Sequence, residues 1–132
     1  MQKMRYINLL SKISHVSTNK CFVYNNAIIF AVPKSMVSKA IGTSAKNIKS
    51  MQNIFDKKVK IIVQPESEND AERFVKAIVE PVQFKSLENK GNEFVLTAGS
   101  QSKAALIGRN KRRLVELNQI IQDCFGKGLR II

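Results

Sequence analysis

The feature that most constrains the fold of this chain is an internal repeat with an offset of 66 residues. In the first copy a small apolar segment ends at Ile41-Gly42, and in the second a similar segment ends at Ile107-Gly108. In each copy three polar, small or basic residues follow, and then an amphipathic pattern that begins with cations. Because a glycine just past a helix end accommodates a left-handed turn, each copy predicts a short helix, a tight turn and a second helix.

The repeat divides the 132 residues into two halves of similar length. The offset of 66 holds from Asn26/Asn92 to Met51/Leu117, and an extension of the last helix then shifts it to 70. We therefore expect two small domains, residues 1–65 and 66–132, joined by a short linker. Domains of this size bury a limited core, so we expect the two to pack on each other.

The first half has the pattern of an α-β-β-α-α-β unit. Its expected elements are a helix at 4–13, strands at 21–24 and 27–32, a short helix ending at Ile41, a longer helix after Gly42 and a strand at 59–63. Asn25-Asn26 between the two strand runs is a hairpin signal. Ser35 is expected to cap the short helix.

The second half repeats this order. Its expected elements are a helix with the apolar face Ala71, Phe74, Val75 and Ile78, strands at 82–87 and 93–98, a short helix ending at Ile107, a long helix after Gly108 and a strand at 129–132. Ser67 with Asp70 is a capping signal for the first helix. Ser100 or Ser102 is expected to cap the short one.

The net charge of +12 is unevenly distributed. Residues 1–55 hold eight cations and no carboxylate, residues 56–80 are close to neutral, and residues 81–132 hold nine cations and four carboxylates. This balance favours a polyanionic partner, with nucleic acid ahead of acidic protein or anionic membrane. The alternative is a basic surface that serves only solubility.

Several function classes have no support in the sequence. The two cysteines, Cys21 and Cys124, are too few for a disulfide framework or a metal site, and both are expected to be buried. His15 is the only histidine and has no acid near it, and no P-loop, nucleophile elbow or metal-ligand spacing occurs. We expect no enzyme activity, cofactor, metal or small-molecule substrate. Neither a membrane span nor a signal peptide is present, so we expect a cytoplasmic protein.

An α-β-β-α-α-β unit with an Ile-Gly-x-x turn between its last two helices resembles the type II KH domain. The tandem pair resembles the short archaeal NusA-like transcription termination and antitermination factors. The resemblance covers nearly the whole chain; its motifs are Met4-Arg5-Tyr6, residues 28–32, Lys39-Ala40-Ile41-Gly42, Asn47-Ile48 and Ala104-Ala105-Leu106-Ile107-Gly108. It implies an α+β fold of two tandem type II KH domains, each with a three-stranded sheet covered by helices.

In that family the turn is a GxxG loop, whose backbone clamps about four nucleotides of a single strand. Carried over by position, the loops are Gly42-Thr43-Ser44-Ala45 and Gly108-Arg109-Asn110-Lys111. Both lack the closing glycine: Ala45 adds one methyl group, whereas Lys111 either obstructs the backbone or replaces an amide contact with a charge. The residues expected to bind RNA are Lys39, Ile41, Gly42, Thr43, Ser44, Ala45, Lys46, Lys49, Ile107, Gly108, Arg109, Asn110, Lys111, Arg112 and Arg113.

The second turn places four cations within five residues at a helix start, namely Arg109, Lys111, Arg112 and Arg113. Cations there oppose the helix dipole at a cost of roughly 0.3–1 kcal/mol each, so the pattern favours a bound anion over a solvated basic face. An apolar groove for bases is expected beside the turns. Its candidates, which the core also needs, are Ile41, Ile48 and Ile62 with their repeats Ile107, Leu114 and Ile131.

Together these patterns predict a non-enzymatic protein that binds single-stranded RNA. The resemblance implies a role on nascent RNA in transcription elongation or termination, with RNA polymerase or ribosomal components as further partners. Two alternatives remain open at this stage: a factor that binds ribosomal or ribosome-assembly RNA, and a protein-interaction adaptor with degenerate KH domains. A duplex-DNA binder ranks third, because no helix presents base-reading side chains in the usual arrangement.

Overall fold

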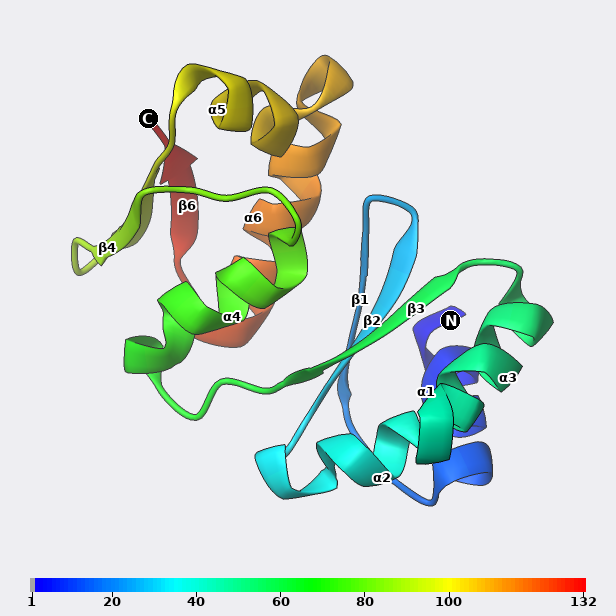
Figure 1. Ribbon diagram of the computed structural model, residues 1–132. Helices are drawn as coiled ribbons and strands as arrows, with labels where there is room; N and C mark the ends of the chain where they lie inside the picture. Colours follow the sequence, from blue (N-terminus) through cyan, green and yellow to red (C-terminus); the bar gives the residue numbers. More distant parts are fainter. Residues whose placement is uncertain (1) are drawn as a thin grey trace. The chain divides into compact units, whose positions relative to one another are not determined.

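The computed structural model describes residues 2–132, and the chain divides into two compact units, Met1–Gln64 (unit 1) and Pro65–Ile132 (unit 2). Figure 1 shows the elements of both units. Each unit has the element order α-β-β-α-α-β and one three-stranded sheet. The chain is therefore an α+β protein built from two copies of one topology, as the repeat predicted.

Unit 1 contains three helices and three strands. They are α1 (Gln2–Ser14), β1 (Lys20–Tyr24), β2 (Ala27–Val32), α2 (Val37–Ile41), α3 (Lys46–Phe55) and β3 (Lys58–Val63). β1 and β2 form an antiparallel hairpin, and Asn25 and Asn26 have φ values of 51° and 61°, as the twist of a two-residue hairpin requires. β3 pairs with β2 in parallel. A parallel pair needs a long crossover, and here α2, the Gly42 turn and α3 supply it.

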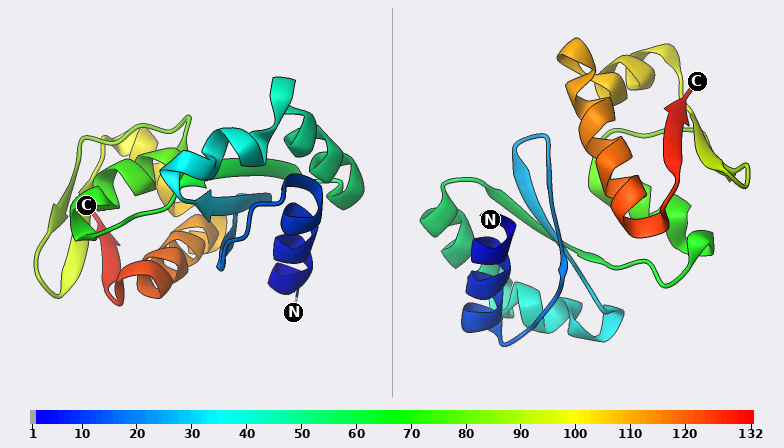
Figure 2. Two further views of the ribbon diagram at one scale, coloured as in Figure 1. Left: turned by 90° about the horizontal axis from the view of Figure 1, so that it is seen from below. Right: turned by 180° about the vertical axis from the view of Figure 1, so that it is seen from behind.

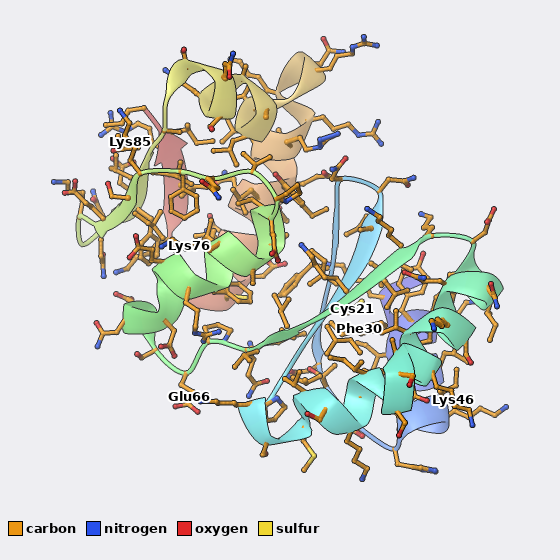
Figure 3. The ribbon with its side chains drawn as sticks, viewed as in Figure 1. Cys21, Phe30, Lys46, Glu66, Lys76 and Lys85 are labelled. Atoms are coloured by element: carbon orange, nitrogen blue, oxygen red, sulfur yellow. The ribbon has the colours of Figure 1, made fainter. Side chains whose placement is uncertain are left out.

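The core of unit 1 lies between the helices and one face of the sheet. Phe30 on β2, Leu10 on α1 and Met51 on α3 have no solvent-accessible surface, and they belong to one apolar cluster. Figure 3 shows Phe30 inside the unit. Burial of each such side chain stabilises the fold by about 1.5–3 kcal/mol. The helices that flank the Gly42 turn are thus fixed to the sheet, and the turn inherits a fixed position.

Unit 2 repeats this plan with a longer last helix. Its elements are α4 (Ala71–Val79), β4 (Ser86–Asn89), β5 (Glu93–Thr97), α5 (Ser100–Ile107), α6 (Arg112–Phe125) and β6 (Gly128–Ile131). β4 and β5 are antiparallel, and β5 and β6 are parallel. The core contains Phe74 and Phe94, and the ring of Phe125 packs edge-on against both, at centroid distances of 6.1 and 5.3 Å.

Several local expectations were wrong. The first strand of unit 2 is Ser86–Asn89 and not residues 82–87, because the chain after α4 makes a turn in which the Val82 amide donates to the Val79 carbonyl. β4 therefore extends into the segment expected to be the hairpin loop. Cys21 is buried, as expected, but Cys124 is only partly buried.

The predicted caps also differ from the structure. Ser35 lies inside a short 3-10 turn, and Ser100 is already the first residue of α5, which follows Gly99, so neither it nor Ser102 caps that helix. Ser67 does cap, accepting a hydrogen bond from the amide of Asn69. Asp70 accepts one from the amide of Glu66, one residue earlier than a standard capping box.

A polar cluster ties together three parts of unit 2. The Lys127 ammonium donates to the Glu68 carboxylate at 2.6 Å and to the Asn89 side-chain oxygen at 3.2 Å, and the Asn89 amide donates to Glu68 at 2.7 Å. The same ammonium lies 5.5 Å from the centroid of the Phe94 ring. The hydrogen bond from Lys127, followed by the one from Asn89, lowers the pKa of Glu68 below its ordinary value of 4.5.

A Glu68→Gln variant tests this cluster. A lowered pKa in the folded state means that ionised Glu68 stabilises the fold above pH 4.5 and that this contribution is lost as the pH falls through the lowered pKa. We therefore expect the variant to unfold at a lower urea concentration than the wild type at pH 7, and the difference to shrink steadily below pH 4.5. A Glu88→Gln variant, whose partner Lys90 is adjacent and exposed, is the control. A difference independent of pH would contradict the assignment.

Candidate nucleic-acid interface

The two glycine turns have the same backbone conformation. Gly42 has φ 81° and ψ 166°, and Gly108 has φ 74° and ψ 174°, a region that essentially only glycine adopts. A side chain would also lack space, since a Cβ atom at either glycine would lie 3.1 Å from the backbone nitrogen of Asn47 or of Arg113. Each turn thus requires its glycine twice over, and each projects outward from its own unit (Figure 2).

The residues after each glycine follow the same path although their sequences differ. Ser44 and Ala45 have φ values of 55° and 59°, and Asn110 and Lys111 have values of 56° and 60°. The turn closes when the fourth residue donates its amide to the glycine carbonyl, at 3.1 Å in unit 1 and 3.2 Å in unit 2. The second helix then begins at once, at Lys46 or Arg112.

This path explains what the missing closing glycines mean. Ala45 and Lys111 occupy the position where the resemblance predicts glycine, and both are left-handed. A left-handed conformation costs a residue with a Cβ atom roughly 1–2 kcal/mol, whereas glycine adopts it freely. The substitutions therefore add strain to the turn without changing its shape.

Two amides in each turn are available to an acceptor from outside. Among the residues that the structure describes, the backbone N–H groups of Thr43 and Ser44, and those of Arg109 and Asn110, donate no hydrogen bond. They precede the N-termini of α3 and α6, where the helix dipole favours negative charge. The arrangement can hold one phosphate or a similar anion at each turn.

Most of the predicted basic side chains are exposed around these amides. Lys39, Lys46 and Lys49 are exposed around the first turn, and Figure 3 labels Lys46 at the start of α3. At the second turn Arg109, Lys111 and Arg112 are exposed. Arg113 differs, because its side chain is partly buried and packs against Gly108. It supports the turn and is poorly placed to contact a ligand.

The apolar groove candidates also separate into two groups. Ile41 and Ile48 are partly exposed and pack on the core of unit 1 with one side. Their repeats Ile107 and Leu114, together with Ile131, are likewise partly exposed. Ile62, with 7% of its surface exposed, is buried and unavailable to a ligand. The residues that directly flank the glycines thus remain candidates for contact with a base.

Sequence reasoning missed two features of the turns. The Asn47 side-chain amide donates to the Lys39 carbonyl at 3.1 Å and so ties α3 to the end of α2. In unit 2, Val115 is 64% exposed and lines a cleft of about 520 Å³ with Arg109, Asn110, Arg112 and Glu116. An apolar residue that follows four cations was a detectable signal, because the repeat has Lys49 at the matching position.

The charge is divided less evenly between the units than between the halves of the sequence. Unit 1 has eleven Lys and Arg residues against one carboxylate, Asp56, which gives a net charge of +10. Unit 2 has eleven against nine, which gives +2. The first turn therefore lies in a uniformly positive unit, whereas the second depends on the cations next to it.

Replacing the fourth residue of a turn with glycine tests the left-handed conformation. We expect Lys111→Gly and Ala45→Gly each to stabilise the fold by about 0.5–1 kcal/mol, because the relief of strain exceeds the added entropy of the unfolded chain. Urea denaturation at a fixed m-value measures the change. Ala105→Gly, at an exposed position inside α5, is the control and should destabilise by about 1 kcal/mol. Equal destabilisation in all three variants would contradict the turn geometry.

Fold and turn geometry together define a tandem α+β repeat protein with one anion-accepting turn in each unit. Within residues 2–132, no group of three or more His, Cys, Asp and Glu side chains is arranged to hold a metal ion, and no helix is long and apolar enough to cross a membrane.

Comparison with known proteins gives two likenesses. The chain is 30% identical over 83 residues to the probable transcription termination protein NusA of Methanocaldococcus jannaschii. The alignment covers 63% of this chain and 44% of that protein, so the chain matches less than half of the relative's length. The crystal structure of APE1850 has the same fold, with a TM-score of 0.67, 22% identity and coverage of 99% of this chain and 98% of that one. No protein-family model matches the sequence.

Proposed function

We propose that this chain is a non-enzymatic, cytoplasmic protein that binds single-stranded RNA and acts in transcription elongation or termination. The observation that carries the proposal is the recurrence of one strained turn, with free amides and adjacent cations, in both units. Two sequences that differ at every position after the glycine preserve the same anion-accepting geometry. The likeness to a probable transcription termination protein supports the biological setting.

We infer further that each unit is a type II KH domain. The order α-β-β-α-α-β and the parallel pairing of the last strand with the second fit that domain. A turn between the last two helices is where such a domain holds the backbone of a single strand. Phosphates would accept from the amides of Thr43 and Ser44, while bases would lie against Ile41 and Ile48.

The two turns would hold RNA in different ways. In unit 1 the residues after Gly42 are small and uncharged, so a phosphate can approach the amides closely, and the positive field of the unit attracts the strand. In unit 2 the long side chains of Arg109, Lys111 and Arg112 surround the amides. Arginine binds phosphate through a bidentate fork, so side chains there supply much of the attraction that the nearly neutral unit lacks.

Removing cations from the turns tests this model. If about six phosphates are neutralised, log K should fall with log salt at a slope near −4 for a single strand, and each lost contact should reduce that slope by about 0.7. We expect Lys46→Ala/Lys49→Ala and Arg109→Ala/Arg112→Ala each to weaken binding of a short single-stranded RNA about tenfold or more and to lower the slope by about 1.4. Fluorescence anisotropy at several salt concentrations measures both quantities.

The matched controls remove the same charge elsewhere in each unit. Lys57→Ala/Lys58→Ala acts at the far end of α3, and Lys85→Ala/Lys90→Ala acts at β4 and its approach. Smaller losses in the controls would support the turns. Equal losses in turn and control variants, or tighter binding of duplex DNA than of single strands, would refute the model.

A nearly isosteric substitution tests the amides separately from the cations. Asn110→Asp adds one negative charge beside the free amides while keeping a residue that tolerates a left-handed conformation. Repulsion between the carboxylate and an RNA phosphate should cost about 1 kcal/mol, or about fivefold in Kd. In unit 1, Ser44→Asp should weaken binding in the same way, with Ser44→Asn as its neutral control. RNA binding that is insensitive to both Asp variants would exclude the turns as phosphate sites.

A further inference from the structure

A second surface of unit 1 lies between α1 and α3, which contact each other along their length (Figure 1). A cleft of about 470 Å³ opens there, lined by Arg5, Asn8, Leu9 and Lys12 of α1 and by Ile54 and Phe55 of α3. We call it the α1–α3 groove. No step proposed for the glycine turns uses it.

The floor of the α1–α3 groove is apolar and well ordered by packing. Ile54 is 53% exposed, and Leu9 and Phe55 are partly exposed. The Phe55 ring makes an edge contact with Tyr6 at a centroid distance of 4.7 Å, which fixes its position. Met4, 64% exposed, lies one helical turn before Asn8 and extends the apolar surface along α1. Contiguous exposed apolar surface of this kind marks a binding site more often than chance.

Two cations border this floor on α1. Arg5 and Lys12 are seven residues apart, about 10 Å along the helix axis, with Leu9 between them. In the described part of the chain neither forms an ion pair with a carboxylate. Asp56 is the single carboxylate of unit 1, so the groove lies in a strongly positive field. The complementary ligand has an apolar stripe flanked by negative charge.

We propose that the α1–α3 groove binds an acidic amphipathic helix of a partner protein. A helix laid into a groove presents apolar side chains at i, i+3 or i+4 and i+7, which suits a floor formed by two side-by-side helices. Carboxylates two turns apart on the ligand would pair with Arg5 and Lys12. The proposal goes beyond RNA binding and does not depend on it.

The chemistry of the groove disfavours RNA as its ligand. The Arg5 guanidinium lies 5.6 Å from the centroid of the Phe55 ring and covers one ring face, so a base cannot stack there. The walls are helix faces, whose backbone amides are engaged within the helices. The groove also lies at the opposite end of α3 from the Gly42 turn, about 12 Å away along the axis. An RNA strand at the turn and a helix in the groove would therefore bind to different ends of one element.

Selection from a library of random 16-residue peptides displayed on phage, against the full chain, tests the proposal. We expect enrichment of peptides with apolar residues at helical spacing and a net negative charge. The synthesised peptides should bind at low-micromolar Kd, the range of many helix-in-groove contacts. Ile54→Lys should weaken binding at least tenfold, whereas Val115→Lys, at an equally exposed apolar site of unit 2, should leave it unchanged.

Charge reversal gives a second readout that does not depend on packing. An Arg5→Glu/Lys12→Glu variant should lose the acidic peptides at least tenfold and should bind versions in which their carboxylates are replaced by lysine. Lys57→Glu/Lys58→Glu is the matched control. Enrichment of basic or purely apolar peptides, or insensitivity to Ile54→Lys, would overturn the proposal. Displacement of the peptide by a single-stranded RNA oligomer would also overturn it and would assign the groove to nucleic acid.

Discussion

The structure of each unit depends on a backbone conformation that only glycine adopts comfortably. At Gly42 and Gly108 the chain leaves one helix and enters another within four residues, and a Cβ atom would collide with the start of the second helix. Because both helices pack on the same three-stranded sheet, the sharp turn is what allows the crossover between parallel strands to stay short. The turn must project outward for the same reason, so its amides face solvent. Fold and candidate function thus share one constraint.

Strain and charge are distributed differently around that shared turn. The residues after each glycine are left-handed without being glycine, which costs free energy in both units. Unit 1 combines small residues in the turn with a net charge of +10, whereas unit 2 is nearly neutral and gathers its cations at the turn itself. The duplicated units have therefore kept the geometry of the turn and diverged in how they attract an anion. A pair of this kind can contact one polyanion through a backbone contact and a side-chain contact.

The cores and element order were predictable from the sequence, and the details around element ends were not. Periodicity located the apolar faces of α3 and α4, and Asn25-Asn26 located the first hairpin, because these signals depend on neighbouring residues alone. The start of β4 was wrong, since β-rich residues after Pro81 are held in a turn that follows α4. The serine caps were wrong because the helices begin at other residues, and Arg113 and Ile62 were misjudged because packing decides which members of a motif reach solvent.

The sequence by itself determined the duplication, the α+β class, the two glycine turns and the excess of positive charge, since all four are properties of order and composition along the chain. Only the tertiary structure decided three further matters. It established that Ala45 and Lys111 take up the left-handed conformation, that the two units differ sharply in net charge, and that α1 and α3 together form a groove bordered by Arg5 and Lys12. The physical reason is that these features join residues from separate elements. Local patterns specify each helix, whereas the packing on the sheet specifies which side chains of two helices meet.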